Sequence, residues 1–404
     1  MTIFIQLFAV GVLCLAFLYL GSLGLGSWQR MAWARAAHQA DRDVWQARLA
    51  EAQVRLADAR EQEGLVAWTG FRRFVIKRKE VENANGSICS FYLWPEDERP
   101  LPAFRPGQYL TLRIPSASSP VIRCYSLSDR PNPDYYRISV RRVEGGTASN
   151  ILHDHLDEGD VIDVQAPAGD FCIDVFDPSP IVLMAGGVGI TPFLSMVSTI
   201  AARTPGREMH LFYGARDTDD LVLLDELKHQ AKRGRNIQIH VCLSASGEAQ
   251  PGHFRERIST DLLGRCLPSL NYDFMICGPD AMMHGLRDDL KTWGVPKDRI
   301  HIEHFAPPVP EGPAPAASEV AHRIIFLRSG EELVWNPKAG NLLQFALDNG
   351  VRMPAGCRAG NCGTCRANVR GEVDYFSEPG FTGLRSSECL PCVCRPMADL
   401  EIDA

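Results

Sequence analysis

The sequence predicts a multidomain chain in which a membrane helix and a helical stalk precede an antiparallel β-barrel, a doubly wound α/β domain and a small C-terminal domain. Three observations lead to this prediction. The segment 1–28 has no charged side chain, 67–178 alternates apolar and polar residues between turn signals, and 179–305 alternates strand and helix patterns. A Pro-rich linker at 306–320 then separates the C-terminal domain, 321–404.

The composition is that of a globular protein with more than one core. The chain has 404 residues, of which 45% are hydrophobic and 23% are charged, so two or three domains are expected. The formal net charge is −7. Nucleic-acid-binding domains usually carry a basic surface, and this charge argues against that class.

The N-terminal segment 1–28 is predicted to be a single-pass membrane anchor. Its apolar run from Ile3 to Leu25 is long enough to cross a hydrocarbon core of about 30 Å. No Lys or Arg precedes the run, and Arg30 and Arg35 follow it, which places the rest of the chain in the cytoplasm. The alternative, a cleaved signal peptide, requires a positively charged start and a cleavage site.

The segment 29–66 is predicted to be a helical stalk. It is rich in Ala, Arg, Gln, Glu and Asp, and no Gly or Pro occurs between Met31 and Glu63.

The two central regions differ in their patterns of strands. A hairpin is expected around Asn85-Gly86, and this region reads as an antiparallel barrel. In the next region, strands that alternate with helices imply a parallel sheet, with one helix expected over Leu221–Arg233. The strands expected after the hairpin are Tyr109–Ile114, Tyr136–Arg142, Asp160–Gln165, Ile181–Met184, Glu208–Tyr213, Asn236–Cys242 and Asp273–Cys277.

The cysteines indicate a metal cluster near the C-terminus. Six of the thirteen cysteines follow residue 356, and Cys357, Cys362 and Cys365 have the C-x4-C-x2-C spacing of plant-type [2Fe–2S] centres. A fourth thiolate must come from elsewhere, and the residues leave Cys392, Cys394 and Cys389 as candidates. Zinc is the alternative, but structural zinc sites favour two short cysteine pairs.

A flavin site is predicted on one short strand. A flavin needs a cation for its phosphate, an aromatic ring against its own ring and a small donor near N5; Arg123, Tyr125 and Ser126 supply these three. A Gly-rich turn from Gly146 leads into a helix expected over Ser149–Leu156. The N-terminus of a helix binds phosphate through its free N–H groups and its dipole.

A dinucleotide loop is predicted after the first apolar strand of the α/β region. Gly186, Gly187 and Gly189 follow that strand, and Thr191 opens a helix. Cys277 ends a later strand of the same sheet, at the edge where ligands bind.

These motifs resemble the ferredoxin–NADP reductase superfamily, and the region from Ala67 to Phe305 is most similar to the reductase part of flavohaemoglobins. The R-x-Y-S strand at Arg123, the G-G-x-G-I-T-P loop, Tyr213-Gly-Ala-Arg and C-G-P-D occur in the family's order. With the C-terminal cysteine motif, the arrangement resembles single-chain reductases that serve Rieske oxygenases, hydroxylases and desaturases. The resemblance implies a β-grasp ferredoxin fold for the C-terminal domain.

The resemblance also implies cofactors and residue roles. The cofactors are FAD, with FMN as the alternative, NADH and a [2Fe–2S] cluster. The flavin residues are Tyr109, Arg123, Tyr125, Ser126, Gly146 and Ser149, with Ser126 near N5, and Glu303 and Phe305 lie beside the flavin. Gly186, Gly187, Gly189 and Thr191 bind the dinucleotide, Cys277 lies near the hydride-donating carbon, and Cys392 aligns with the fourth iron ligand after Cys357, Cys362 and Cys365.

NADH is favoured over NADPH because Asp217, Asp219 and Asp220 would repel a 2′-phosphate, although Arg216 has the opposite effect.

Two departures from relatives reduce the number of functions that fit the chain. The predicted anchor occupies the place of a flavohaemoglobin's globin, and the ferredoxin domain follows the flavin domain instead of preceding it, as it does in the sodium-pumping quinone reductase.

We therefore expect a membrane-anchored reductase that passes electrons from NADH through flavin and cluster to an acceptor protein, an oxygenase, hydroxylase or desaturase. Ser126, Cys277 and Glu303 are its predicted catalytic residues. Direct reduction of quinones or metal ions, and a redox-sensing role, are the alternatives.

Overall fold

The computed structural model describes residues 67–83, 85–116, 120–245, 252–305, 322–336, 339–360, 363–376, 379, 381 and 384–404. No helix within these ranges is long and apolar enough to cross a bilayer. The predicted anchor, the stalk and the Pro-rich linker lie outside the described residues, and so does Cys362.

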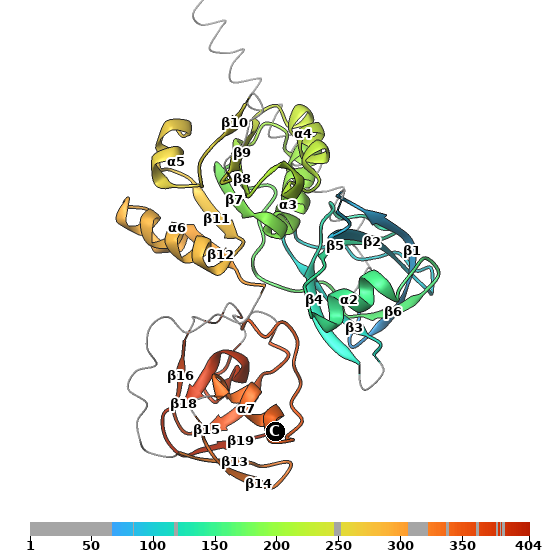
Figure 1. The fold of residues 1–404 in the computed structure, drawn as a ribbon, viewed down its shortest axis with the longest axis vertical. Coiled ribbons are helices and arrows are strands. Elements are labelled where there is room, and N and C mark those ends of the chain that lie inside the picture. The colour runs from blue at the N-terminus through green and yellow to red at the C-terminus, as the bar shows by residue number, and fades with distance from the viewer. Residues whose placement is uncertain are drawn as a thin grey trace, which may run out of the picture. The chain divides into compact units, whose positions relative to one another are not determined.

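The first domain is an antiparallel sheet of six strands in the order β4-β3-β6-β1-β2-β5 (Figure 1). An isolated bridge between Leu127 and Ile138 joins the ends of the sheet, at β4 and β5, so the strands close into the predicted barrel. The strands are β1 (Arg72–Val81), β2 (Ile88–Pro95), β3 (Tyr109–Ile114), β4 (Val121–Ser126), β5 (Tyr136–Arg141) and β6 (Val161–Val164).

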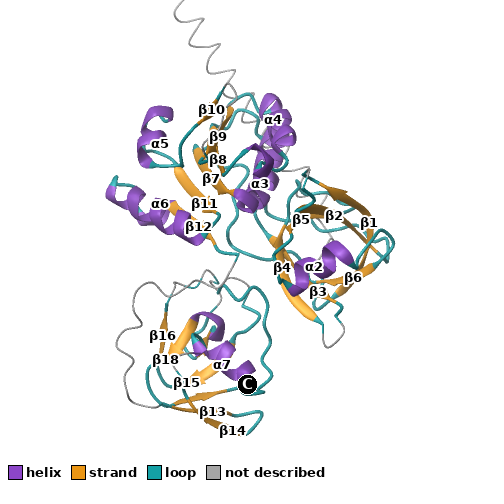
Figure 2. Cartoon of the chain, in the orientation of Figure 1, coloured by secondary structure: helices purple, strands orange, loops and turns teal. Residues whose placement is uncertain are grey.

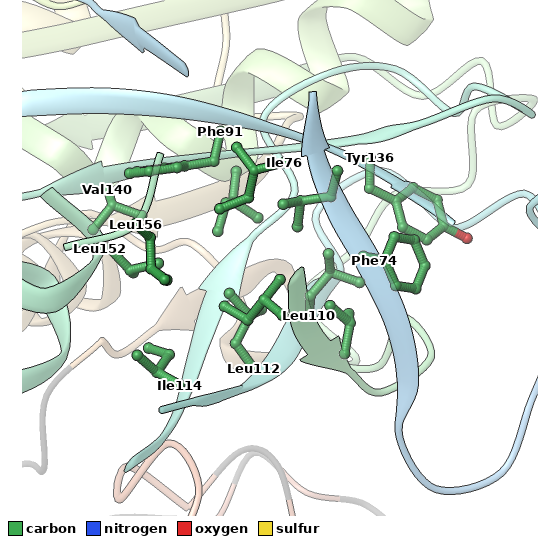
Figure 3. Close-up of a cluster of buried hydrophobic side chains, with 14 of the residues drawn as sticks. Phe74, Ile76, Phe91, Leu110, Leu112, Ile114, Tyr136, Val140, Leu152 and Leu156 are labelled. Carbon is green, nitrogen blue, oxygen red and sulfur yellow. The ribbon is translucent and has the colours of Figure 1, made fainter. Parts of the chain in front are cut away.

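The barrel is filled by apolar side chains that alternate along its strands (Figure 3). Phe74 and Ile76 of β1 have no exposed surface, whereas Lys77 and Arg78 after them lie outside. Helix α2 (Thr147–Asp154) adds Leu152 to the same cluster. Each such burial contributes about 1.5–3 kcal/mol, so the core holds α2 against the barrel.

The second domain is a parallel sheet in the order β10-β9-β8-β7-β11-β12. Helices α3 and α4 lie on one face and α5 and α6 on the other (Figures 1 and 2). All six residues of β7 are buried because both faces are covered. The strands are β7 (Ile181–Gly186), β8 (Met209–Ala215), β9 (Ile237–Leu243), β10 (His253–Phe254), β11 (Asp273–Cys277) and β12 (Ile300–Glu303); the helices are α3 (Thr191–Arg203), α4 (Leu224–Arg233), α5 (Thr260–Cys266) and α6 (Asp280–Thr292).

Two predicted helices begin at other residues in the structure. Helix α2 begins at Thr147, because Gly146 has extended backbone angles and caps it, so Ser149 lies in its first turn. Helix α4 begins at Leu224, not at Leu221. A 3-10 turn at Thr218–Asp220 and the left-handed Leu223, whose φ is 55°, interrupt the chain before it.

The third domain has the predicted β-grasp character. Its mixed sheet has the order β14-β13-β19-β15-β17, in which β13 and β19 are parallel, and helix α7 (Leu342–Asp348) packs on it through a shared apolar cluster. The strands are β13 (Arg323–Phe326), β14 (Glu331–Val334), β15 (Ala367–Arg370), β17 (Glu388–Cys389) and β19 (Leu400–Ile402), with a separate pair formed by β16 (Val373–Tyr375) and β18 (Cys394–Pro396).

Two neighbouring histidines in the second domain, the buried His210 and the half-buried His240, make stability depend on pH. Nδ1 of His210 lies 3.1 Å from Nε2 of His240, whose ring stacks on Phe212. Burial, and then the neighbouring His210, lower the pKa of His240 from 6.5 to about 4. The unfolded chain therefore takes up this proton at a higher pH than the folded chain. The stabilisation is complete above about pH 6.5 and is lost as the pH falls toward 4.

We expect the free energy of unfolding to fall by up to about 2 kcal/mol between pH 7 and pH 5 through His240. In His240→Gln, which keeps a hydrogen-bonding partner for His210, this fall should be smaller. Urea denaturation at the two pH values measures it, and the exposed His229→Gln on α4 is the control. An unchanged pH dependence in His240→Gln would contradict the assignment.

Candidate active site

The predicted flavin residues lie on two adjacent strands of the barrel. β3 and β4 pair so that Tyr109 is opposite Ser126 and Leu112 is opposite Arg123. Arg123 and Tyr125 are two residues apart and therefore lie on one face of β4, where both are half-buried. Burial raises the pKa of Tyr125 well above its usual range, and Arg123 offsets this only in part. The phenol therefore stays protonated and can donate a hydrogen bond.

A cavity of about 180 Å³ brings Tyr109 together with Glu303, the last residue of β12. Both side chains are buried, at 5% and 7% exposure. The Tyr109 ring lies against the backbone of Gly169, where a Cβ would come within 2.7 Å of it. Phe305 is 42% exposed and does not line this cavity, so only one of the two residues predicted beside the flavin is found there.

The N-terminus of α2 fits a phosphate group. No described side chain caps this helix, so its first-turn N–H groups have no cap acceptor. The Oγ of Ser149 accepts a hydrogen bond from the N–H of Val143 at 3.1 Å. A Cβ on Gly146 would lie 2.9 Å from that oxygen. Gly146 and Ser149 thus shape the turn itself, and the free N–H groups of the helix are the donors for a ligand.

The predicted dinucleotide loop packs closely against the end of β11. The loop runs from β7 through a 3-10 turn at Gly187–Ile190 into α3. A Cβ on Gly189 would lie 2.5 Å from the carbonyl carbon of Cys277 and 2.8 Å from the N of Gly278. A Cβ on Gly186 would lie 2.6 Å from Pro279. The two motifs therefore approach each other at backbone distance, which only glycine allows.

Thr191, predicted to bind the dinucleotide, and Cys277, predicted near the hydride-donating carbon, have contacts within the protein. The hydroxyl of Thr191 donates to the carbonyl of Val188 at 3.1 Å and thereby closes the turn before α3. The thiol of Cys277 is fully buried, and β11 and β12 pair so that it lies opposite Glu303. Burial, and then the charge of Glu303, raise its pKa well above the usual range. Cys277 is thus a neutral thiol and not a nucleophile.

A cavity of about 600 Å³ opens where the dinucleotide loop faces the barrel. Gly186 and Gly187 line it, whereas Gly189, Thr191 and Cys277 are not among the residues that line it. Several of its polar residues were missed by sequence reasoning, because each is a lone side chain at a strand end or in a loop. These are Arg141, Ser244 and Arg257.

The carboxylates after β8 have two different roles, one in capping a turn and one at the cavity. Asp217 accepts hydrogen bonds from the N–H groups of Asp219 and Asp220 and so caps a 3-10 turn. Asp220 lines the cavity and accepts from Nε of Arg216 at 2.9 Å. The Arg216 charge is therefore compensated by Asp220, an arrangement that suits a ribose hydroxyl better than a 2′-phosphate.

The C-terminal thiols converge as a cluster site requires. Sγ of Cys365 lies 3.3 Å from Sγ of Cys392, and the N–H of Ala359 points at Sγ of Cys357 at 3.3 Å. The backbone of Gly360 hydrogen-bonds to the Cys392 sulfur. Cys365 and burial raise the pKa of Cys392 well above its usual range, so an iron pair would supply the positive charge that these thiolates need.

The two other candidates for the fourth ligand, Cys389 and Cys394, contact each other. Cys389 and Cys394 are fully buried, and their side chains form a hydrogen bond. The structure therefore favours Cys392 over both. Donor type, spacing and inward-pointing N–H groups fit a [2Fe–2S] cluster held by Cys357, Cys365 and Cys392 with the predicted Cys362.

Comparison with known proteins agrees with this reading of the three domains. Family models match residues 73–173 as an oxidoreductase FAD-binding domain, 183–288 as an oxidoreductase NAD-binding domain and 326–397 as a 2Fe-2S iron-sulfur cluster binding domain.

Three similar proteins illustrate the arrangement. A flavohemoprotein of Halalkalibacterium halodurans is 38% identical over 252 residues, which cover 59% of this chain and 61% of that protein. The FAD/NAD-binding domain of nitric oxide dioxygenase from Vibrio cholerae is 31% identical, with a TM-score of 0.53 over 58% of this chain and 99% of that one. Phthalate dioxygenase reductase is 29% identical, with a TM-score of 0.55 over 83% and 98%. The chain thus spans about three-fifths of the curated relative's length.

The fold and the three sites define an NAD(P)H-dependent oxidoreductase that carries FAD and a [2Fe–2S] cluster. The chain belongs to the ferredoxin–NADP reductase superfamily and joins that module to a C-terminal plant-type ferredoxin domain.

Proposed function

We propose that this chain is the reductase component of an oxygenase, hydroxylase or desaturase system, and that its [2Fe–2S] domain is the point where electrons leave. The observation that carries the proposal is the convergence of Cys365 and Cys392 in a domain that follows the FAD- and NAD-binding domains. Phthalate dioxygenase reductase supports it, since the two chains align over 98% of that protein.

When bound, the cofactors supply hydride acceptance at the flavin and single-electron transfer at the cluster. The chain's own residues orient the cofactors and exclude water from the reacting region. The glycines of the dinucleotide loop let the ligand approach the backbone, and Asp220 faces the cavity that would hold it. Tyr109, Cys277 and Glu303 are buried, so the reacting region near them is shielded from solvent.

We propose that Ser126 donates a hydrogen bond to the flavin and that Glu303 holds or moves a proton. Ser126 is the last residue of β4, opposite Tyr109, and is 8% exposed. Glu303 shares the small cavity with Tyr109. Ser126 belongs to the barrel and Glu303 to the α/β domain, so the proposed flavin contacts would come from both domains.

The proposal is tested by separating electron entry from electron exit. In Cys365→Ser, we expect NADH-driven reduction of cytochrome c to be lost, while reduction of ferricyanide, which can accept electrons from the flavin, is retained. Cys266→Ser, a half-buried cysteine of α5 outside the sites, is the control. If Cys365→Ser left both activities unchanged, the cluster would not be the exit.

The N-terminal segment 1–28 is proposed to anchor the reductase to the membrane, with its catalytic domains in the cytoplasm and its acceptor on the same membrane. The support is its run of uncharged residues and the basic residues after it. Cell fractionation followed by a high-pH wash tests this proposal: the full chain should stay with the membranes, and release into the wash would contradict a spanning anchor.

A further inference from the structure

A partly buried ion pair connects the barrel with the α/β domain. Arg137, on β5 of the barrel, donates from Nη1 to Oε2 and from Nη2 to Oε1 of Glu226, both at 2.9 Å. Glu226 lies in the first turn of α4. The side chains are 5% and 25% exposed. Such a two-pronged contact fixes direction as well as distance.

Arg137 also holds the chain that leaves the flavin-binding strand. Its Nε donates to the carbonyl of Ser128 at 3.1 Å, and Nη2 donates to the same oxygen. The N–H of Ser128 donates in return to the carbonyl of Arg137 at 2.9 Å. Ser128 is two residues beyond Ser126, the predicted donor near the flavin. One guanidinium therefore contacts both the flavin strand and the neighbouring domain.

The other end of β5 reaches the dinucleotide cavity. Arg141, its last residue, lines the cavity of about 600 Å³, and its Nη1 lies 3.7 Å from where a Cβ on Gly187 would be. Helix α4 packs on α3, which begins directly after the loop that contains Gly187. A shift of β5 against α4 would therefore move Arg141 relative to the loop.

The contact with Glu226 offsets the cost of burying the Arg137 guanidinium. Burial alone would lower the pKa of Arg137, but the hydrogen bonds and charge of Glu226 outweigh it and raise that pKa. Domains within one chain usually move relative to each other unless their interface prevents it. Hydride transfer is sensitive to such movement, because a misplacement of about 1 Å can cost about a hundredfold in rate.

We propose that Arg137 and Glu226 are positioning residues: their ion pair sets the register between the flavin strand and the dinucleotide loop, and thereby the rate of hydride transfer. This inference rests on the proposed route from NADH to FAD. It concerns neither cofactor's binding contacts, since the pair lies outside the residues assigned to them.

The test uses Glu226→Gln in the full-length holoenzyme, because Glu226 is the less buried partner and its replacement keeps the side chain's shape. Anaerobic stopped-flow mixing with NADH should show flavin reduction slowed about tenfold, with a weaker charge-transfer band between nicotinamide and flavin. Flavin content and NADH affinity should stay within about twofold of wild type. The matched control is Asp163→Asn, which breaks the Arg113–Asp163 pair between two strands of the barrel domain.

Arg137→Lys and the double variant complete the design. Lysine keeps the charge but cannot make the two-pronged hydrogen bond, so Arg137→Lys should also slow flavin reduction. The double variant should be no slower than the slower single variant. Flavin reduction within twofold of wild type in Glu226→Gln, with only stability reduced, would overturn the inference. If wild-type flavin were not reduced by NADH at all, the proposed function would fail instead.

Discussion

Replacing Cys392 by alanine is expected to abolish the [2Fe–2S] cluster, whereas Cys389→Ala and Cys394→Ala should keep it. The reason is geometric: the Cys392 sulfur lies 3.3 Å from that of Cys365, while Cys389 and Cys394 hydrogen-bond to each other. Cluster occupancy in Cys392→Ala should fall by more than tenfold, since even outer contacts of metal sites cost about 10- to 100-fold.

Iron and sulfide analysis, with the visible spectrum, measures this outcome in proteins with equal flavin content. The alanine variants of Cys389 and Cys394 serve as matched controls, because all three positions are buried and within six residues of one another. Retention of the cluster in Cys392→Ala together with its loss in Cys394→Ala would show that the fourth ligand has been misassigned.

The second large effect is expected from Gly189→Ala. Its Cβ would collide with the carbonyl group of Cys277 and lie 2.8 Å from the N of Gly278. Both are backbone atoms that cannot rotate away, so the dinucleotide loop and the end of β11 must separate. We expect NADH-driven reduction of the flavin to fall by about a hundredfold, because the reacting carbon would be displaced by about 1 Å.

The control is Gly206→Ala, at a position where an added Cβ meets nothing within 4 Å. This variant should reduce its flavin at the wild-type rate. Stopped-flow measurement with saturating NADH distinguishes the two. A Gly189→Ala protein as active as the Gly206→Ala protein would mean that the loop does not position the nicotinamide.

Local patterns in the sequence predicted most of the strands and helices. The strands Tyr109–Ile114 and Asp273–Cys277 have the expected bounds, because alternation and a continuous apolar run are properties of the segment itself. The start of α4 was predicted wrongly, since the cap at Asp217 and the left-handed Leu223 are decided by local hydrogen bonds that periodicity does not show.

Contacts between distant residues could not be predicted in the same way. Arg137 and Glu226 are 89 positions apart, and each alone reads as an ordinary charge on a strand or helix. The choice among Cys389, Cys392 and Cys394 likewise depends on how β17, β18 and the 3-10 turn between them place three closely spaced thiols. Spacing alone leaves that choice open.

Strand β5 also limits how the enzyme can be recombined with its relatives. It belongs to the barrel, yet Arg141 lines the dinucleotide cavity and Arg137 bonds to α4. A chimaera that exchanged the barrel alone at residue 178 would pair a foreign β5 with the native α4. An active chimaera should therefore require Glu226 and the rest of α4 to be exchanged together with the barrel. The segment that can be exchanged is then larger than one domain.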